Sequence, residues 1–310
     1  MSFTSNIRSE IAGQIPKSRH CQTAELLALI AQNARIFKSS DEKYFFIFQT
    51  ESLTVAKKSY ILLNRLFNVK SEVSVVSHMP HSTRRSYVIS IDNNVERLIG
   101  ALKLESTEGK LLYEEKHSWK KLLTSTCCKR AFLAGIFLTS GSVTNPEKSY
   151  HLELNVPDEE MVSLIKYAFD AFSLDLRTVE RKGNKVIYIK DAEKISEFLS
   201  ILGAGKSMME LENVRIMKGL RNNVNRQVNC ETANIDKTVN AARKQIEDIN
   251  TLIERGEFGS LSPEIQEVAY LRLDNPDASL TELAALSGGN ISRSGINHRL
   301  RKISKLASGE

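Results

Sequence analysis

Residues 130–142, with the sequence RAFLAGIFLTSGS, constrain the fold of this chain more than any other stretch. Large apolar side chains lie on almost every side of the helix that these residues would form, which predicts burial over most of its surface. Ala131, Ala134 and Gly135 share that helix, where small residues let a second backbone approach closely. Gly141 is expected to end the helix as a C-terminal glycine. A helix of this kind requires a partner helix.

The partner is predicted far upstream, in residues 24–34. Residues 26–34 (LLALIAQNA) align with residues 133–141 (LAGIFLTSG), apolar on apolar and small on small. Core positions in the two helices are expected at Leu29, Ile30, Leu133 and Ile136. The alignment indicates that the two helices are related copies that pack against each other.

Each of these helices begins the same order of elements, α-β-α-β-β-α. The first copy is expected to have a helix from Thr23, a strand over 44–50, a helix over 51–67, strands over 72–77 and 86–91, and a helix over 94–104. The second is expected to have a helix over 130–140, a strand over 150–156, a helix over 157–172 with Pro157 in its first position, strands over 175–181 and 185–189, and a helix over 191–202. A pattern repeated about a hundred residues apart predicts an internal duplication.

The fold class predicted from this order is α+β, a duplicated α-β-α-β-β-α domain followed by an all-α domain. The expected divisions are an N-terminal helical segment (1–20), the duplicated domain (21–205, with repeats 21–104 and 129–205), a basic linker (206–228) and a helical domain (229–310). Between the repeats, residues 105–128 are expected to form a polar connector with helical pieces that holds the only tryptophan, Trp119.

The end of the chain has the pattern of a helix-turn-helix. Ser262 and Pro263 are suited to the start of one helix, and Ser279 with Glu282 forms a capping box before another. After a Gly288-Gly289 turn, a last helix is expected over 293–307, capped by Ser292 and with an apolar stripe. The stripe consists of Ile296, Leu300, Ile303 and Leu306 or Ala307.

The opposite face of this last helix carries cations and amides and no acid between Ser292 and Ser308. The DNA-binding residues predicted there are Ser292, Arg293, Ser294, Asn297, His298, Arg301, Lys302 and Lys305. Cations can contact phosphates, while Arg and Asn can make paired hydrogen bonds to guanine and adenine. The alternative is a basic, solvated helix that binds nothing.

Other cations are candidates for contacts with the DNA backbone. They are Arg84, Arg85, Arg177, Arg181, Lys182 and Lys185 near the predicted strands, and Arg215, Lys218, Arg221 and Arg226 in the basic linker. Ordinary surface charge is an equally good interpretation of these residues. The net charge of +6 and the pI near 9.0 favour a polyanionic partner only mildly.

The four cysteines, Cys21, Cys127, Cys128 and Cys230, form no CxxC pair, so free buried thiols are expected, with no metal and no cofactor. The N-terminus has no apolar signal stretch, and no segment reaches transmembrane length. A cytoplasmic protein without a membrane partner is therefore expected.

The paired helices, each beginning an α-β-α-β-β-α unit, resemble those of the LAGLIDADG homing endonucleases. The resemblance implies two helices packed along a pseudo-twofold axis and two sheets that form a saddle for DNA. In those enzymes the penultimate residue of each motif is a metal-binding acid. The corresponding residues here are Asn33 and Ser140, and the acids Asp41, Glu42 and Asp158 lie elsewhere. We therefore expect no catalytic residues and no metal ligands at the helix ends.

With the C-terminal pattern included, the whole chain resembles the bacterial WhiA family of transcription regulators. The motifs that carry this resemblance are AELLALI (24–30), AFLAGIFLTSGSVTNP (131–146), YHLEL (150–154), RNNVNRQVNCETANIDKTVNAA (221–242), DASLTELAAL (277–286) and SRSGINHRLRKI (292–303). Ala34 stands where the family usually has glycine.

The resemblance implies a non-enzymatic DNA-binding regulator linked to cell division, sporulation and chromosome organisation. It also implies double-stranded promoter DNA as the partner, at the nucleoid, with another regulator, RNA polymerase or a division factor as further candidates. Two alternatives stay open from the residues themselves. One is a protein-interaction scaffold with secondary DNA binding, and the other is a nuclease with relocated carboxylates.

Overall fold

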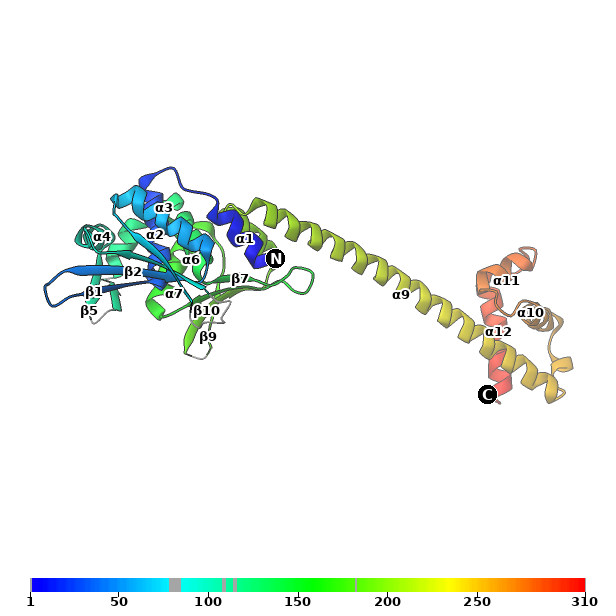
Figure 1. The fold of residues 1–310 in the computed structure, drawn as a ribbon. Helices are drawn as coiled ribbons and strands as arrows, with labels where there is room; N and C mark the ends of the chain where they lie inside the picture. Colours follow the sequence, from blue (N-terminus) through cyan, green and yellow to red (C-terminus); the bar gives the residue numbers. More distant parts are fainter. Residues whose placement is uncertain (1, 78–84, 108–109, 114–115, 182, 310) are drawn as a thin grey trace. The chain divides into compact units, whose positions relative to one another are not determined.

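The structure is a computed structural model that describes residues 2–77, 85–107, 110–113, 116–181 and 183–309 (Figure 1). The chain divides into two units, Met1–Met217 and Lys218–Glu310. Each unit has its own buried apolar core. The two are described separately.

Unit 1 begins with α1 (Phe3–Ala12) and then contains two copies of one arrangement. The first copy comprises α2 (Arg19–Asn33), β1 (Ala34–Lys38), β2 (Tyr44–Thr50), α3 (Leu53–Phe67), β3 (Glu72–Ser77), β4 (Arg85–Ile91) and α4 (Val95–Leu102). The second comprises α6 (Thr126–Ser140), β7 (Gly141–Val143), β8 (Leu152–Val156), α7 (Glu159–Phe169), the short η1 (Asp170–Phe172), β9 (Arg177–Arg181), β10 (Asn184–Ile189) and α8 (Ala192–Ile201).

The two sheets have the same strand order, and every pairing within them is antiparallel. The first is β1-β2-β4-β3 and the second is β7-β8-β10-β9. Since an equivalent order recurs with equivalent helices, the predicted duplication and the α+β fold class are confirmed. Between the copies lie a two-stranded ribbon, β5 (Leu104–Thr107) with β6 (Lys110–Tyr113), and α5 (Lys116–Leu122). The ribbon was not expected from the sequence.

The helices α2 and α6 pack against each other in the interior of unit 1, and Figure 1 shows them side by side. Leu29, Ile30, Leu133 and Ile136 are fully buried, as predicted. Gly135 lies where the two helices are in tight contact. A Cβ atom there would lie 2.6 Å from Cβ of Ala28 and 2.7 Å from the carbonyl oxygen of Glu25. The small residues of this helix therefore serve the close contact that the sequence indicated.

Both paired helices run directly into a strand, and this corrects the prediction for Gly141. Its backbone is extended (φ −78°, ψ 142°), so it begins β7 and is not a left-handed helix end. A Cβ atom would lie 2.3 Å from Cδ2 of Phe137, so contact with that ring explains the glycine. The equivalent residue, Ala34, has φ −108° and ψ 153°, a conformation that needs no glycine.

The start of α7 is a second correction. The sequence placed Pro157 in the first position of the helix, but α7 begins at Glu159. The N-cap is Asp158, whose carboxylate accepts a hydrogen bond of 2.8 Å from the backbone N–H of Met161. An aspartate at this position satisfies a backbone donor that would otherwise be free, and this favours the later start.

Unit 2 is all-helical. It contains most of α9 (Gly205–Glu254), then η2 (Phe258–Ser260), α10 (Pro263–Asp274), α11 (Leu280–Leu286) and α12 (Arg293–Ser308). The segment expected as a basic linker, 206–228, is part of the continuous helix α9. The core of unit 2 is formed by Ile249, Leu252, Ile265, Val268, Ala269, Leu283, Ile291, Ile296, Leu300, Ile303 and Ala307.

Candidate nucleic-acid interface

The two helices α11 and α12 are joined by a turn with well-defined local signals. Ser279 and Glu282 form the predicted capping box at the start of α11. Gly288 and Gly289 both have positive φ, at 69° and 77°, which favours glycine at each position. Ser292 then caps α12 by accepting a 3.2 Å hydrogen bond from the backbone N–H of Gly295. These features fix the direction in which α12 leaves the turn.

The loop before α11 is held by Arg272, whose role the sequence did not indicate. Its side chain is 1% exposed, and its Nη1 donates hydrogen bonds to the carbonyl oxygens of Ala278 (2.6 Å), Asn275 (3.2 Å) and Pro276 (3.4 Å). Burial lowers the pKa of this guanidinium from its usual value. A single buried cation thus fixes the chain that leads into the helix-turn-helix.

Replacing Arg272 with methionine is expected to destabilise unit 2 by about 2 kcal/mol, because three partly buried hydrogen bonds from a charged donor to backbone carbonyls are lost. Hydrogen–deuterium exchange of the amides of α11 should accelerate correspondingly. The matched control is Arg255→Met, since Arg255 is exposed just after α9. Equal protection of α11 in both variants would show that the loop does not depend on Arg272.

The helix α12 presents two different faces. Ile296, Leu300, Ile303 and Ala307 are buried in the core of unit 2, so Ala307 completes the stripe and Leu306 is 37% exposed. On the other side, Asn297 is half-buried and seven predicted contact residues are exposed. They are Ser292, Arg293, Ser294, His298, Arg301, Lys302 and Lys305. The structure therefore brings the predicted DNA-binding set together on one accessible surface.

The residues of this surface differ in whether their polar groups are already hydrogen-bonded within the protein and in which part of DNA they could contact. The hydroxyl of Ser292 is already occupied by the helix cap and lies 2.9 Å from Oγ of Ser294. Arg293 and Asn297 lie in the first turns of α12, where side chains of such helices reach base edges. Arg301, Lys302 and Lys305 lie further along, where positive charge can contact phosphates.

Two polar contacts of α12 point toward the rest of unit 2 and were missed in the sequence. Arg299 is one-quarter exposed and lies 3.9 Å from a carboxylate oxygen of Glu264 on α10. The hydroxyl of Ser304 donates a hydrogen bond to the carboxylate of Asp248 on α9. The positions of Arg299 and Ser304 along the helix could have shown that these residues lie off the basic face. The sequence could not have identified Glu264 and Asp248 as their partners.

The basic candidates on the strands of unit 1 are partly neutralised. Arg181 donates a 2.8 Å hydrogen bond to Glu153, and Lys185 donates one of 2.8 Å to Glu180. A hydrogen bond from His151, with the nearby charge of Arg181, holds the pKa of Glu153 below its usual value. Arg85 and Arg177 are exposed, whereas Arg84 and Lys182 lie outside the described residues. DNA would have to compete with these carboxylates on the second sheet.

The candidates on α9 are also not uniform. Arg215 pairs with Glu212 at 3.0 Å, and Lys218 is half-buried. Arg221 and Arg226 are exposed. This stretch is a side of one long helix and not a loose basic linker.

The ends of the helix pair carry no acid at the two positions compared with the endonuclease motifs. Asn33 donates a hydrogen bond of 2.9 Å to the carbonyl of Leu29, and Ser140 donates one of 3.0 Å to that of Ile136. Both side chains are half-buried and bond to their own helices. Elsewhere, Asp158 caps α7 and Glu42 pairs with Lys38.

Comparison with protein families gives three matches that together cover most of the chain. A model described as the WhiA N-terminal LAGLIDADG-like domain matches residues 19–105. The WhiA LAGLIDADG-like domain matches residues 129–221, and the WhiA C-terminal HTH domain matches residues 224–307.

Among the described residues, no helix is both long and apolar enough to cross a membrane.

Two relatives align with this chain over nearly the whole length of both proteins. A protein of Lachnoclostridium phytofermentans is 38% identical over 100% of this chain and 99% of its own length. One of Anoxybacillus flavithermus is 40% identical over 99% of this chain and 94% of its own. Both carry the name "Probable cell division protein WhiA". The crystal structure of full-length DUF199/WhiA from Thermatoga maritima is similar, with a TM-score of 0.60, 25% identity and coverage of 100% and 99% of the two chains.

Proposed function

This chain belongs to the WhiA family, and we propose that it is a non-enzymatic DNA-binding regulator of transcription that acts in cell division and sporulation. The observation that carries the proposal is the face of α12 opposite the core of unit 2, which holds exposed cations, the half-buried amide of Asn297 and no acid. Its position after a capped turn matches the way a recognition helix is presented to the major groove. Such a protein would work in the cytoplasm, at the nucleoid.

Base reading is assigned to Arg293 and Asn297. We expect Arg293→Ala and Asn297→Ala each to weaken binding to the preferred site by about 1–3 kcal/mol and to relax the preference at one position. Lys302→Ala should instead weaken binding to all sequences alike and reduce the salt slope by about 1. The preferred site would first be identified by genome-wide mapping of bound DNA, and affinities would be measured at several salt concentrations.

The matched control for charge is Arg243→Ala. Arg243 is 80% exposed on α9 and lies outside the proposed surface. Its replacement removes one positive charge, as Arg293→Ala does, but removes no proposed DNA contact. Binding that stays unchanged in Arg293→Ala and Asn297→Ala, or that falls equally in the Arg243 variant, would contradict the assignment of α12.

The absence of nuclease activity is part of the proposal. In the homing endonucleases, metal-dependent cleavage uses acids at the ends of the paired helices, and an amide and a hydroxyl that donate to backbone carbonyls do not replace them here. Supercoiled plasmid incubated with the protein and Mg²⁺ or Mn²⁺ should remain uncut. Nicking that persists through purification and is abolished by Asp158→Asn or Asp41→Asn would support relocated carboxylates instead.

A further inference from the structure

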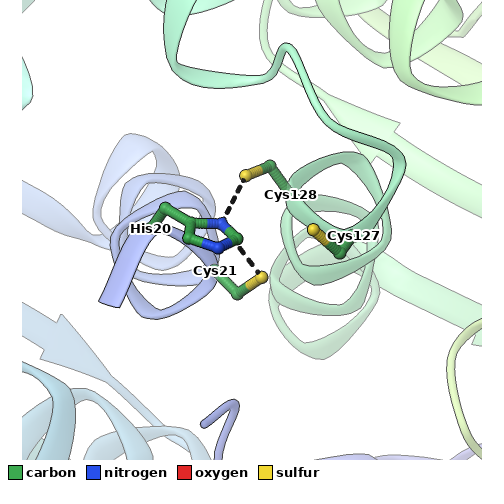
Figure 2. Close-up of side chains that lie close together, drawn as sticks. All are labelled: His20, Cys21, Cys127 and Cys128. Carbon is green, nitrogen blue, oxygen red and sulfur yellow. Dashed lines mark hydrogen bonds between the residues drawn. The ribbon is translucent and has the colours of Figure 1, made fainter. Parts of the chain in front are cut away.

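Four side chains that sequence spacing left unconnected lie together at the start of the paired helices. His20 and Cys21 are in the first turn of α2, and Cys127 and Cys128 are in the first turn of α6. Their ligand atoms, one imidazole nitrogen and three sulfurs, all lie within 4.8 Å of one another. Figure 2 shows the side chains of the two helices facing each other across this contact.

The two pairs occupy equivalent places in the duplicated fold. The same offset that aligns Leu26 with Leu133 also aligns His20 with Cys127 and Cys21 with Cys128. Each repeat therefore contributes two adjacent ligands from one helix, and the four meet at the junction of the repeats. The ligands meet because the two repeats of unit 1 are related by pseudo-symmetry. A search for CxxC spacing cannot detect such a site.

The distances are close to those of a tetrahedral site. A zinc ion bound by three sulfurs and one nitrogen holds its ligand atoms about 3.6–3.8 Å apart. Here Nδ1 of His20 lies 3.1 Å from Sγ of Cys128 and 3.4 Å from Sγ of Cys21. Since no pair of ligand atoms exceeds 4.8 Å, small side-chain rotations would suffice to enclose an ion.

The burial of the four side chains and the charges around them also suit a zinc ion. Cys21 and Cys128 are 8% and 3% exposed, whereas His20 and Cys127 are exposed and give an ion an access path. Cys21 and Cys127 also line a hollow of about 330 Å³ with Lys17 and Arg130. These cations, with the N-termini of both helices, would offset the net negative charge of a site with three thiolates.

We propose that His20, Cys21, Cys127 and Cys128 bind one zinc ion that fastens the two repeats of unit 1 together. Four protein ligands leave no open position, so the site is structural and not catalytic. Binding displaces the thiol protons to solvent, since zinc coordinates thiolates. The proposal does not depend on DNA binding, because all four residues lie in unit 1.

The test uses the full chain without a polyhistidine tag, purified with reductant and without chelator. Elemental analysis should give about one zinc per chain for the wild type and for Cys230→Ser, whose exposed thiol on α9 lies outside the cluster. The double variant Cys127→Ser/Cys128→Ser should hold about a tenth of that amount or less.

Cobalt provides a second readout if the double variant does not fold. Replacing zinc with Co²⁺ in the wild type should give the visible bands of a tetrahedral site and a sulfur-to-metal charge-transfer band. That band should fall to about two thirds in Cys127→Ser, which removes one of three sulfurs at an exposed position. His20→Asn should shift the visible bands and leave the charge-transfer band nearly unchanged.

Three results would overturn the proposal. One is the failure of the reduced wild type to take up stoichiometric zinc in a titration against a competing dye. Another is equal uptake by the wild type and the double variant. The third is a disulfide between the two cysteine pairs, found by mass spectrometry after alkylation of the protein purified under reductant, because oxidised sulfurs cannot serve as thiolate ligands.

Discussion

Replacing Glu25 with alanine is expected to lower the free energy of unfolding of unit 1 by about 3–5 kcal/mol. The carboxylate forms an ion pair with Lys58 of α3, and the two side chains are 1% and 2% exposed. Nζ of Lys58 also donates a 3.0 Å hydrogen bond to the carbonyl of Ile11. Removing Glu25 leaves the ammonium group buried with one backbone acceptor, and an unpaired buried charge carries a large desolvation cost.

The directions in which the two pKa values shift have the same physical cause as this cost. Burial raises the pKa of Glu25 to about 7, although the charge of Lys58 opposes the shift. Burial likewise lowers the pKa of Lys58 from its usual value, against the effect of Glu25. In both groups desolvation outweighs the partner, so neither charge is stable here by itself.

Urea unfolding followed by tryptophan fluorescence measures the effect in unit 1 alone, since Trp119 is the only tryptophan and lies there, buried. The control is the double variant Glu25→Leu/Lys58→Met, which removes both charges and keeps the volume. It should unfold within about 1–2 kcal/mol of the wild type, because an apolar pair replaces a buried ion pair at little net cost. A loss below about 1 kcal/mol in Glu25→Ala would show that water or a rearranged side chain solvates Lys58.

The sequence predicted those features of the fold that depend on local periodicity. The stripe of Ile296, Leu300 and Ile303, the caps at Ser279 and Ser292, and the repeated order of helices and strands all follow from side chains a few residues apart. The strands β1 and β7 were missed because each follows a helix directly, with no intervening loop, and β7 has only three residues (Gly141–Val143). Their pairing with β2 and β8 is a tertiary contact with little local signature.

Contacts between distant segments account for the rest. The partners of Arg181 and Lys185 could not be predicted from the sequence, so candidate cations that appeared equally available differ in the structure. The same holds for the carbonyl partners of Arg272, which the sequence did not single out. The cluster of His20, Cys21, Cys127 and Cys128 was missed for the same reason, since its halves are joined only when α2 packs on α6. The duplication in the sequence could have indicated the cluster, because it aligns His20 with Cys127 and Cys21 with Cys128. The spacing of cysteines along one segment could not.

Gly135→Ala is expected to destabilise unit 1 by about 3 kcal/mol, near the top of the range for overpacking. The added methyl group would lie 2.6 Å from Cβ of Ala28 and 2.7 Å from the carbonyl oxygen of Glu25. Neither atom belongs to a flexible side-chain end, so α2 and α6 would have to separate along their contact. That separation would also strain the ion pair of Glu25, because Glu25 lies on α2 where that helix faces Gly135.

The matched control is Gly100→Ala, an equal substitution in a helix of the same unit. Nothing lies within 4 Å of a Cβ atom at Gly100 in α4, so this change should stabilise unit 1 by about 0.5–1 kcal/mol through helix propensity. The two alanine variants should therefore shift the urea midpoint, followed by fluorescence of Trp119, in opposite directions. A rise of the midpoint in both variants would mean that helix propensity outweighs packing at Gly135, and that the two helices can separate without loss of stability.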